Sequence, residues 1–245
     1  MRAIFHHAYF VPWLGYFSKL EVADALVVLD AAKFRRNHIK RVSIIGTHGG
    51  PEWFTLPVGN NWSVPCNEIV LPAGPDYVTK LLRTLKLSYG RAAAFKEEFA
   101  DFEILFSRTY FPGRDIVAAN IQAITELRRR WTSSTTTILI ASQYSQAADR
   151  DQRMIEICWH LGIREIVAGD GSMLRVHDLA RIKRAGIRVL HYPFKLWHPT
   201  YTQVQRERLG KPFVSGLSAV DAIFNVGSAR IPELLWPPNL KLENL

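Results

Sequence analysis

The residue types best suited to chemistry stand near the N-terminus, where a short apolar run leads into His6 and His7. The apolar spacing that follows predicts a helix that opens on Pro12. The N–H groups at the start of a helix lack partners and lie at the positive end of its dipole, so an anion can bind there. We therefore expect a phosphate or another oxyanion to bind beside the two histidines.

The first histidine is the stronger candidate for catalysis. Neighbouring residues of a strand point to opposite faces, so only one of the two histidines readily faces the site. We assign that position to His6, as a hydrogen-bond donor to developing negative charge or as a general base. A hydrogen bond that only holds the loop is the alternative. His7 has either a structural or surface role or a part in phosphate binding.

The predicted helix adds more candidates. Lys19 comes four residues after Gly15 and could lean back towards a bound anion or stay solvated. Trp13 and Tyr16 are either core aromatics or walls on which a ligand stacks. Together with Pro12, these residues form the first candidate site for an activated donor.

Three further polar residues stand where predicted elements begin or end. Asp30 ends the second strand and could bind a hydroxyl, an amine or a metal ion, or cap the turn that follows. Arg41 closes a basic stretch, residues 35–41, and could hold a phosphate or carboxylate through two hydrogen bonds. Ser218 precedes an apolar run and would cap a helix there.

The order of strands and helices decides where these residues meet. The first two strands flank a helix, and residues 132–227 alternate strand and helix, which predicts parallel pairing. We expect one α/β domain over residues 1–245, with a mostly parallel, Rossmann-like sheet and flanking helices. Residues 42–131 would add a hairpin and a helical segment, and residues 228–245 a tail. Ligands of such sheets bind beyond the carboxyl ends of the strands, where His6 would lie.

Local patterns set the expected boundaries of the other elements. Helical apolar spacing, with Asp115 as a cap for the third segment, runs through residues 77–89, 95–111, 116–131, 149–161 and 174–185. Short strands are expected at residues 42–46, 53–58, 68–72, 138–142, 166–172 and 187–192.

Composition narrows the classes of function. The net charge of +9 favours polyanionic partners such as nucleic acid, phosphorylated substrates or an anionic membrane surface. No apolar run approaches the length of a membrane span and no signal peptide precedes the first strand, so we expect a cytoplasmic protein. Cys66 and Cys158 are the only cysteines, and their spacing favours neither a disulfide framework nor a zinc site. No structural metal is expected, and the cofactor and the oligomeric state stay unassigned.

These motifs together resemble the WbqC-like family, which is associated with bacterial surface-polysaccharide and natural-product gene clusters. The family opens on a motif like I-H-Q-P-x-Y-x-P-W-L-G-Y-F-x-K, matched by His6, Pro12, Trp13, Leu14, Gly15, Tyr16, Phe17 and Lys19. His7, Ala8 and Phe10 depart from that motif. A second signature, Y-x-Q, then F, then L-S-x-x-D-x-L-F-N-x-G, is matched by Tyr201, Gln203, Phe213, Leu217, Ser218, Asp221, Phe224, Asn225 and Gly227. From this signature we expect Tyr201, Gln203, Asp221 and Asn225 to bind substrate.

A weaker likeness is to the opening of nucleotidylyltransferases and class I synthetases. Their first strand also ends in histidine at a helix N-terminus, but the glycine and second histidine of their H-x-G-H motif are missing here. Residues 169–172 and 216–218 take the late positions where those enzymes contact nucleotide, which makes Ser218 a candidate phosphate ligand.

Two hypotheses of function follow. In the first, the protein is a cytoplasmic group transferase in the biosynthesis of a sugar-containing metabolite or surface polysaccharide. It moves an acyl, aminoacyl or nucleotidyl group from a phosphate-bearing or nucleotide-linked donor, with His6, Lys19 and Asp30 in catalysis; an aminoacyl group would suit tRNA as carrier. In the second, the protein binds a nucleotide or tRNA without catalysis and assists another enzyme.

Overall fold

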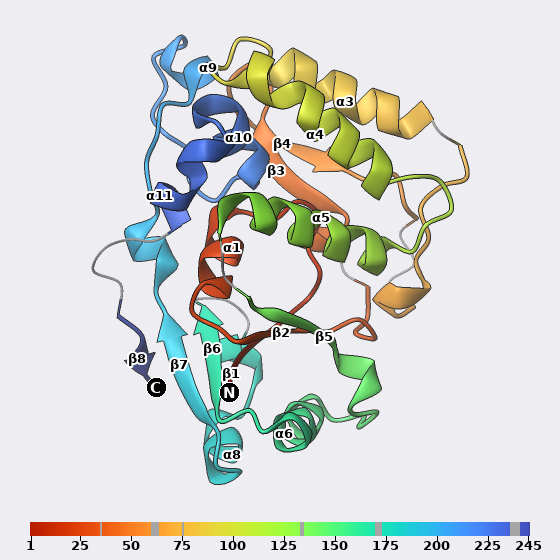
Figure 1. The fold of residues 1–245 in the computed structure, drawn as a ribbon, viewed down its shortest axis with the longest axis vertical. Helices are drawn as coiled ribbons and strands as arrows, with labels where there is room; N and C mark the ends of the chain where they lie inside the picture. Colours follow the sequence, from red (N-terminus) through yellow and green to blue (C-terminus); the bar gives the residue numbers. More distant parts are fainter. Residues whose placement is uncertain (35, 60–63, 75, 133–134, 170–172, 236–240) are drawn as a thin grey trace.

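The computed structural model describes residues 1–34, 36–59, 64–74, 76–132, 135–169, 173–235 and 241–245. In this part of the chain, a six-stranded sheet and a separate two-stranded hairpin are surrounded by helices (Figure 1). The α/β class, with a mostly parallel sheet and an inserted hairpin, is confirmed.

The six-stranded sheet has the order β5-β2-β1-β6-β7-β8. Its strands are β1 (Arg2–His6), β2 (Ala25–Val28), β5 (Thr137–Ile140), β6 (Glu165–Gly169), β7 (Arg188–Tyr192) and β8 (Glu243–Asn244). All neighbours pair in parallel except β7 and β8. From β1 the chain adds β2 and β5 on one side, then crosses over and adds β6 and β7 on the other. The direction of winding therefore reverses between β1 and β6, which is where doubly wound sheets bind their ligands.

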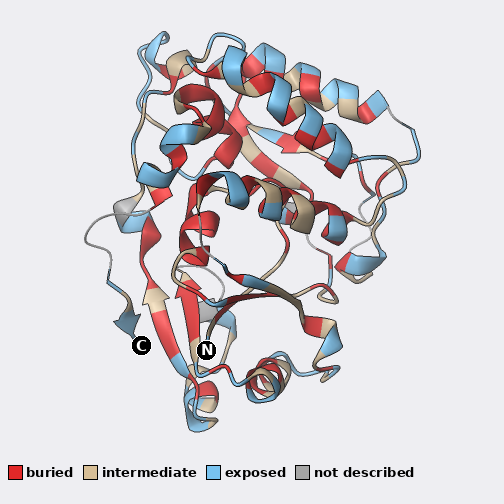
Figure 2. Ribbon diagram, in the orientation of Figure 1, coloured by how far each residue is buried: buried red, intermediate tan, exposed pale blue. Residues whose placement is uncertain are grey.

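The central strands are buried on both faces because alternate side chains enter two different cores. Ile4 of β1 joins the larger core with α1 (Leu14–Leu20) and α5 (Ile116–Trp131). Ala3 joins a smaller core with α6 (Arg150–Leu161) and α8 (Leu179–Arg184). Figure 2 shows β6, much of β7 and helix α1 as buried, in contrast to the outer faces of the peripheral helices.

The insertion between β2 and β5 builds a second layer. Its hairpin consists of β3 (Arg41–Ile45) and β4 (Pro51–Thr55). Helices α3 (Asp76–Tyr89) and α4 (Phe95–Thr109) pack on each other and on α10 (Ala219–Val226), which also contacts β3. Figure 1 shows this layer at the top, above α5 and the parallel sheet. The hairpin thus comes to one end of the sheet, near the carboxyl end of β1.

Shorter elements lie between these helices and strands. These are α2 (Arg36–Ile39), η1 (Cys66–Glu68), η2 (Ala141–Gln143), α7 (Met173–Val176), η3 (Phe194–Trp197), α9 (Val204–Glu207), η4 (Ser228–Arg230) and α11 (Ile231–Leu235).

Two predicted helix caps, Asp115 and Ser218, are confirmed. The carboxylate of Asp115 accepts a hydrogen bond from the N–H of Ala118 at 2.6 Å, and α5 follows at once. Ser218 caps α10 through the N–H of Val220 at 3.3 Å. Gly162 ends α6 with φ of 66°, the left-handed conformation that glycine adopts without strain.

The prediction that the first helix opens on Pro12 is wrong. Trp13 is extended, with ψ of 163°, and pairs with Ser218 as a short antiparallel bridge. The carbonyl of Pro12 accepts a hydrogen bond from the N–H of Ala219 at 2.9 Å. This pairing with a distant segment keeps the chain extended, so α1 begins only at Leu14.

Three other expectations differ from the structure. The strand expected at residues 68–72 is replaced by η1 and a single bridge between Val70 and Asp115. The helix expected at residues 174–185 is divided into α7 and α8, because Asp178 caps α8 through the N–H of Arg181 at 3.0 Å. Within residues 228–245, where we expected a tail, the chain forms η4, α11 and β8. None of the described helices is long and apolar enough to cross a membrane.

Candidate functional site

A cavity of about 420 Å³ opens at the carboxyl ends of β1 and β6. The position is the one that the reversal of the strand order predicts, and the volume is typical of small-molecule sites. Eight of the residues that the sequence singled out line it: His6, Pro12, Trp13, Gly15, Lys19, Gly169, Gly216 and Ser218. The N-terminal motif therefore does meet the C-terminal signature, at Ser218.

His6 lies in this cavity with its ring enclosed by Tyr9 and Tyr16, whose ring centroids are 4.4 and 4.7 Å away. Its Nδ1 atom is 3.2 Å from the carbonyl oxygen of His7. Because a carbonyl can only accept, Nδ1 carries the proton and Nε2 is left unprotonated. Burial, and then the nearby charge of Lys19, hold the pKa of His6 well below its usual value. At neutral pH this imidazole is therefore a base and not a cation.

Lys19 brings positive charge into the same cavity. It belongs to the last turn of α1 and is only 8% exposed. Its Nζ atom would be 3.7 Å from a Cβ at Gly169, so it lies against the carboxyl end of β6. Lys195 of η3 adds a second ammonium group, and the described residues that line the cavity include no Asp or Glu. The cavity is thus suited to an anion.

Aromatic rings form much of the wall. Tyr9 and His38 stack with centroids 4.7 Å apart and ring planes 24° apart. Trp13 meets Phe194 edge to face at 5.3 Å. A Cβ at Gly15 would come within 2.5 Å of Trp13 and 2.6 Å of Phe194, so both rings pack directly on the backbone of α1. These walls favour a planar ring or another apolar group beside the anion.

The backbone beside the cavity is strained at two residues. Val11 has φ of 31° and His38 has φ of 71°. Positive φ is rare outside glycine, most of all for a β-branched residue, and such strain tends to occur at functional sites. Ser218 holds the strained turn, since its Oγ donates to the carbonyl of Val11 at 2.7 Å. Ser218 therefore shapes the site as well as lining it.

Some predicted site residues lie behind the cavity or beside it. Tyr16 is buried, and its hydroxyl donates to the carbonyl of His7 at 3.1 Å. His7 itself places Nδ1 at 3.3 Å from the carbonyl of Leu29. The guanidinium group of Arg41 lies 3.9 Å from the ring centroid of Trp53, which does line the cavity.

Asp30 lies away from the cavity. Its carboxylate accepts hydrogen bonds from the N–H and Oγ of Ser142, at 3.0 and 2.6 Å, and from Nδ2 of Asn67 at 3.1 Å. These bonds tie the end of β2 to the turn after β5. The structure thus gives Asp30 the partners of a cap.

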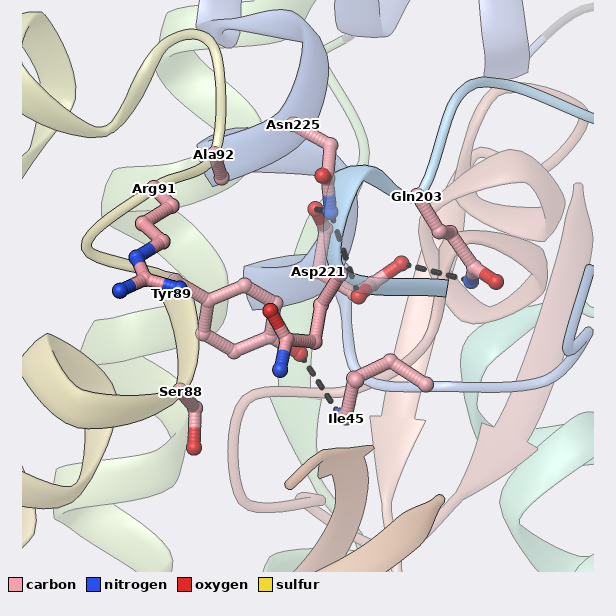
Figure 3. Close-up of a pocket in the computed structure, with 9 residues that line it drawn as sticks. Ile45, Ser88, Tyr89, Arg91, Ala92, Gln203, Asp221 and Asn225 are labelled. Atoms are coloured by element: carbon pink, nitrogen blue, oxygen red, sulfur yellow. Dashed lines mark hydrogen bonds between the residues drawn. The ribbon is translucent and has the colours of Figure 1, made fainter. Parts of the chain in front are cut away.

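The four residues expected to bind substrate form a separate cluster around Asp221. Figure 3 shows three of them, Gln203, Asp221 and Asn225, which are buried. Asp221 Oδ2 accepts hydrogen bonds from Tyr201 at 2.7 Å and from Gln203 at 2.8 Å. Asn225 places Nδ2 at 3.3 Å from Oδ1, and Tyr89 donates its hydroxyl to the same carboxylate. Burial raises the pKa of Asp221, and the surrounding donors oppose that rise. The void beside them is about 10 Å³, roughly the room of one water molecule.

The sequence did not single out several residues that the cavity contains. Tyr192 is the last residue of β7, and the rule that carboxyl ends of strands meet at the site could have found it. His38 lies in the basic stretch 35–41, of which only Arg41 was a candidate. Trp53 carried no such signal. Residues 170–172 of the glycine-rich stretch lie outside the described residues.

The described residues form no obvious metal-binding site. Among the described residues, no group of three or more His, Cys, Asp or Glu side chains is arranged to hold a metal ion. Cys66 and Cys158 are both buried as free thiols.

Comparison with known proteins gives one match. The model of the WbqC-like protein family matches residues 7–233. No curated protein and no solved structure gave a significant match. The matched region runs from the first residue after β1 into α11, and it includes the Asp221 cluster and the N-terminal motif from His7 onward, so that His6 lies one residue before it. The chain is therefore a member of the WbqC-like family.

Proposed function

We propose that the protein is a group transferase that holds an activated, phosphate-bearing donor in the cavity between β1 and β6. One observation carries the proposal: the neutral His6 imidazole, with an unprotonated Nε2, stands beside the buried Lys19 ammonium at the ligand-binding end of the sheet. A base and a cation in one enclosed cavity are what a transfer from a phosphate-bearing donor requires.

The expected roles follow from these two groups. An acceptor hydroxyl or amine attacks the electrophilic carbon or phosphorus of the donor and gives its proton to Nε2 of His6. The bond to the leaving group breaks, and that group departs with the electron pair. Lys19 stabilises the negative charge that develops there, while the enclosing aromatic walls exclude water. The geometry suits acyl, aminoacyl and nucleotidyl transfer alike.

Membership of the WbqC-like family suggests the chemical class of the acceptor. Because the chain belongs to the WbqC-like family, we propose a sugar or a sugar-containing metabolite as the acceptor, on a route to a surface polysaccharide or a natural product. The positive charge of the cavity supports a nucleotide-linked donor, and the overall charge of +9 would also suit tRNA as a carrier.

The first test is a binding survey by thermal unfolding. We would compare nucleotides, sugar nucleotides, acyl-coenzyme A and tRNA, because a ligand at 100 times its Kd stabilises a protein by about 2.7 kcal/mol. For a chain of this length that is a rise in Tm of roughly 5–10 °C. Lys19→Met should weaken the binding of a phosphate-bearing hit by about tenfold or more, because a hydrogen bond to a charged group is lost. Lys80→Met, on the exposed face of α3, is the matched control.

The second test separates catalysis from binding. With the hit and a panel of sugar acceptors, His6→Gln should abolish turnover and keep most of the binding, whereas His160→Gln on the surface of α6 should change neither. A hit confined to tRNA, lost at raised salt and indifferent to both His6 and Lys19, would contradict the transferase proposal. That result would instead favour a non-catalytic accessory protein.

A further inference from the structure

An exposed aromatic residue stands at the mouth of the cavity. Trp53 of β4 is 54% exposed, although it also lines the cavity. In the hairpin, Ser43 is opposite Trp53 and Arg41 is opposite Thr55, so Arg41 and Trp53 are diagonal neighbours on the outer face. Phe54, the next residue, points inward and is fully buried. The hairpin thus buries one face and presents an indole on the other.

The environment of Trp53 differs from that of another exposed tryptophan. Trp159 of α6 is 57% exposed, but its indole N–H donates to the carbonyl of Ala185 at 3.1 Å, which ties it to the surface. Trp53 instead stacks with a cation, because the guanidinium carbon of Arg41 lies 3.9 Å from its ring centroid. An indole next to a guanidinium is a surface on which a further planar ring can stack.

The charges around the mouth have the sign that a phosphate linker needs. Lys195 is exposed on η3 and lines the same cavity as Trp53, and Lys19 lies deeper inside. A ligand that runs from Lys19 to Trp53 would lie in a cavity lined by both ammonium groups and would end beside the Arg41 guanidinium. The cavity of about 420 Å³ holds the inner part of such a ligand, and the Trp53 surface is left for what extends out of it.

We infer that Trp53 and Arg41 form a second subsite, which stacks a nucleobase joined through a phosphate to the group held in the cavity. The inference rests on the proposed function, because it takes the inner group to be the phosphate-bearing donor. Two kinds of molecule carry this chemistry: a free dinucleotide, and the unpaired 3′ end of an RNA. Both place a second base one phosphate away from the first.

The test compares the affinities of a mononucleotide and a dinucleotide, AMP and 5′-phosphorylated ApA, by titration calorimetry. Stacking of one base on an aromatic side chain is worth about 5- to 160-fold in affinity, so the dinucleotide should bind tighter by that ratio. Trp53→Ala should bring the ratio close to one, and Trp53→Phe should restore most of it. Arg41→Gln should lower the ratio by a smaller factor. Trp159→Ala, an equally exposed tryptophan, should leave it unchanged.

A further titration, with tRNA, identifies the source of the second base. If RNA supplies the second base, deacylated tRNA should bind more tightly than the dinucleotide. Trp53→Ala should weaken the binding of this tRNA, but it should not weaken the binding of a tRNA that lacks its last three nucleotides. If a free dinucleotide supplies it, trimming the tRNA should have no effect.

The outcomes of this test also separate the two proposals. The subsite would be overturned if the two affinities are nearly equal in the wild-type protein, or if Trp53→Ala does not change their ratio. This holds even if Lys19→Met still weakens the binding of AMP. A ratio that depends on Trp53, with binding indifferent to Lys19 and with no turnover of any donor, would keep the subsite and overturn the transferase. No binding of either nucleotide would overturn the subsite, whereas the transferase is overturned only if no phosphate-bearing donor of the survey binds in a way that depends on Lys19.

Discussion

The cavity at the end of β1 and the Asp221 cluster both contain polar residues of the family motifs, yet they differ in how the hydrogen-bonding groups of those residues are satisfied. Around Asp221, each carboxylate oxygen accepts hydrogen bonds from neighbouring side chains, and the remaining void has room for about one water molecule. In the cavity, His6 keeps an unprotonated nitrogen, and the backbone at Val11 and His38 is strained. The first arrangement stabilises a fold, and the second keeps groups available for a ligand.

The comparison shows that polar residues of one family signature can serve different purposes. Ser218 belongs to both regions, because it lines the cavity and caps the helix that carries Asp221. Its N–H also donates to the carbonyl of Ser43 at 2.8 Å. We therefore interpret the Asp221 cluster as the support that holds the loop with Ser218 against the cavity.

The largest effect is expected for Asp221→Ala. The change removes the carboxylate that accepts from Tyr201 and Gln203, and only Gln203 keeps a second acceptor, the carbonyl of Val214. Its loss should cost about 3 kcal/mol or more. The Tm should then fall by roughly 6–12 °C. Thermal unfolding measures this, and Asp221→Asn, which keeps one carbonyl oxygen, should lose less. An unchanged Tm together with lost ligand binding would return Asp221 to the substrate-binding role that the sequence suggested.

A smaller effect on stability, but a large one on binding, is expected for Gly15→Ala. The added methyl group would press on the rings of Trp13 and Phe194, so one of them has to move. Overpacking of this kind costs about 1–3 kcal/mol. Nucleotide binding should fall with it, because the moved ring belongs to the cavity wall. Gly74→Ala is the control, since a Cβ at that position meets no atom within 4 Å. If Gly15→Ala binds nucleotide like the wild type, this wall takes no part in binding.

The smallest effect is a dependence of stability on pH. The pKa values of His6, His38 and His198 are all lowered by burial. As the pH falls, these histidines therefore become protonated in the unfolded chain before they do in the folded chain. The free energy of unfolding should therefore fall as the pH drops below about 6.5, by at most about 1.4 kcal/mol per pH unit for each histidine. Urea unfolding at about pH 7 and about pH 5.5 measures the slope.

In His6→Gln, the free energy of unfolding should depend less steeply on pH, because the contribution of one histidine is removed. His160→Gln, on the surface, is the control. The same reasoning predicts that turnover persists below pH 6.5, because His6 stays neutral there. An equal slope in His6→Gln and the wild type would show that the His6 ring is open to water. The contrast with the Asp221 cluster would then be weaker than we infer.

Much of the fold could be predicted from sequence because it depends on local patterns. The helices at residues 116–131 and 150–161 follow apolar spacing and aspartate caps, both of which act within a few residues. The parallel sheet follows from the alternation of strand and helix. Errors arose where a distant partner decided the conformation. Trp13 is extended because of Ser218, and a window of local sequence contains no sign of that bridge.

The candidate site could be predicted in part for the same reason. His6, Gly15 and Lys19 belong to one short segment at the end of the first strand, so a single topological rule located them. Trp53 and Phe194 come from the hairpin and from the stretch after β7, which only the tertiary fold brings together. Tyr201, Gln203, Asp221 and Asn225 do meet, but as neighbours of one another and not of the cavity.

The place of β1 in the sheet has a consequence for synthesis. Its partners are β2, some twenty residues later, and β6, where Arg2 pairs with Glu165. At roughly 5–20 residues per second, on the order of 10–30 s pass before the ribosome has made that second partner. Until then one edge of an apolar strand is open, and the nascent chain is exposed to aggregation or to capture by a chaperone. The same delay applies to the cavity, because no truncated chain that stops short of β6 can contain it.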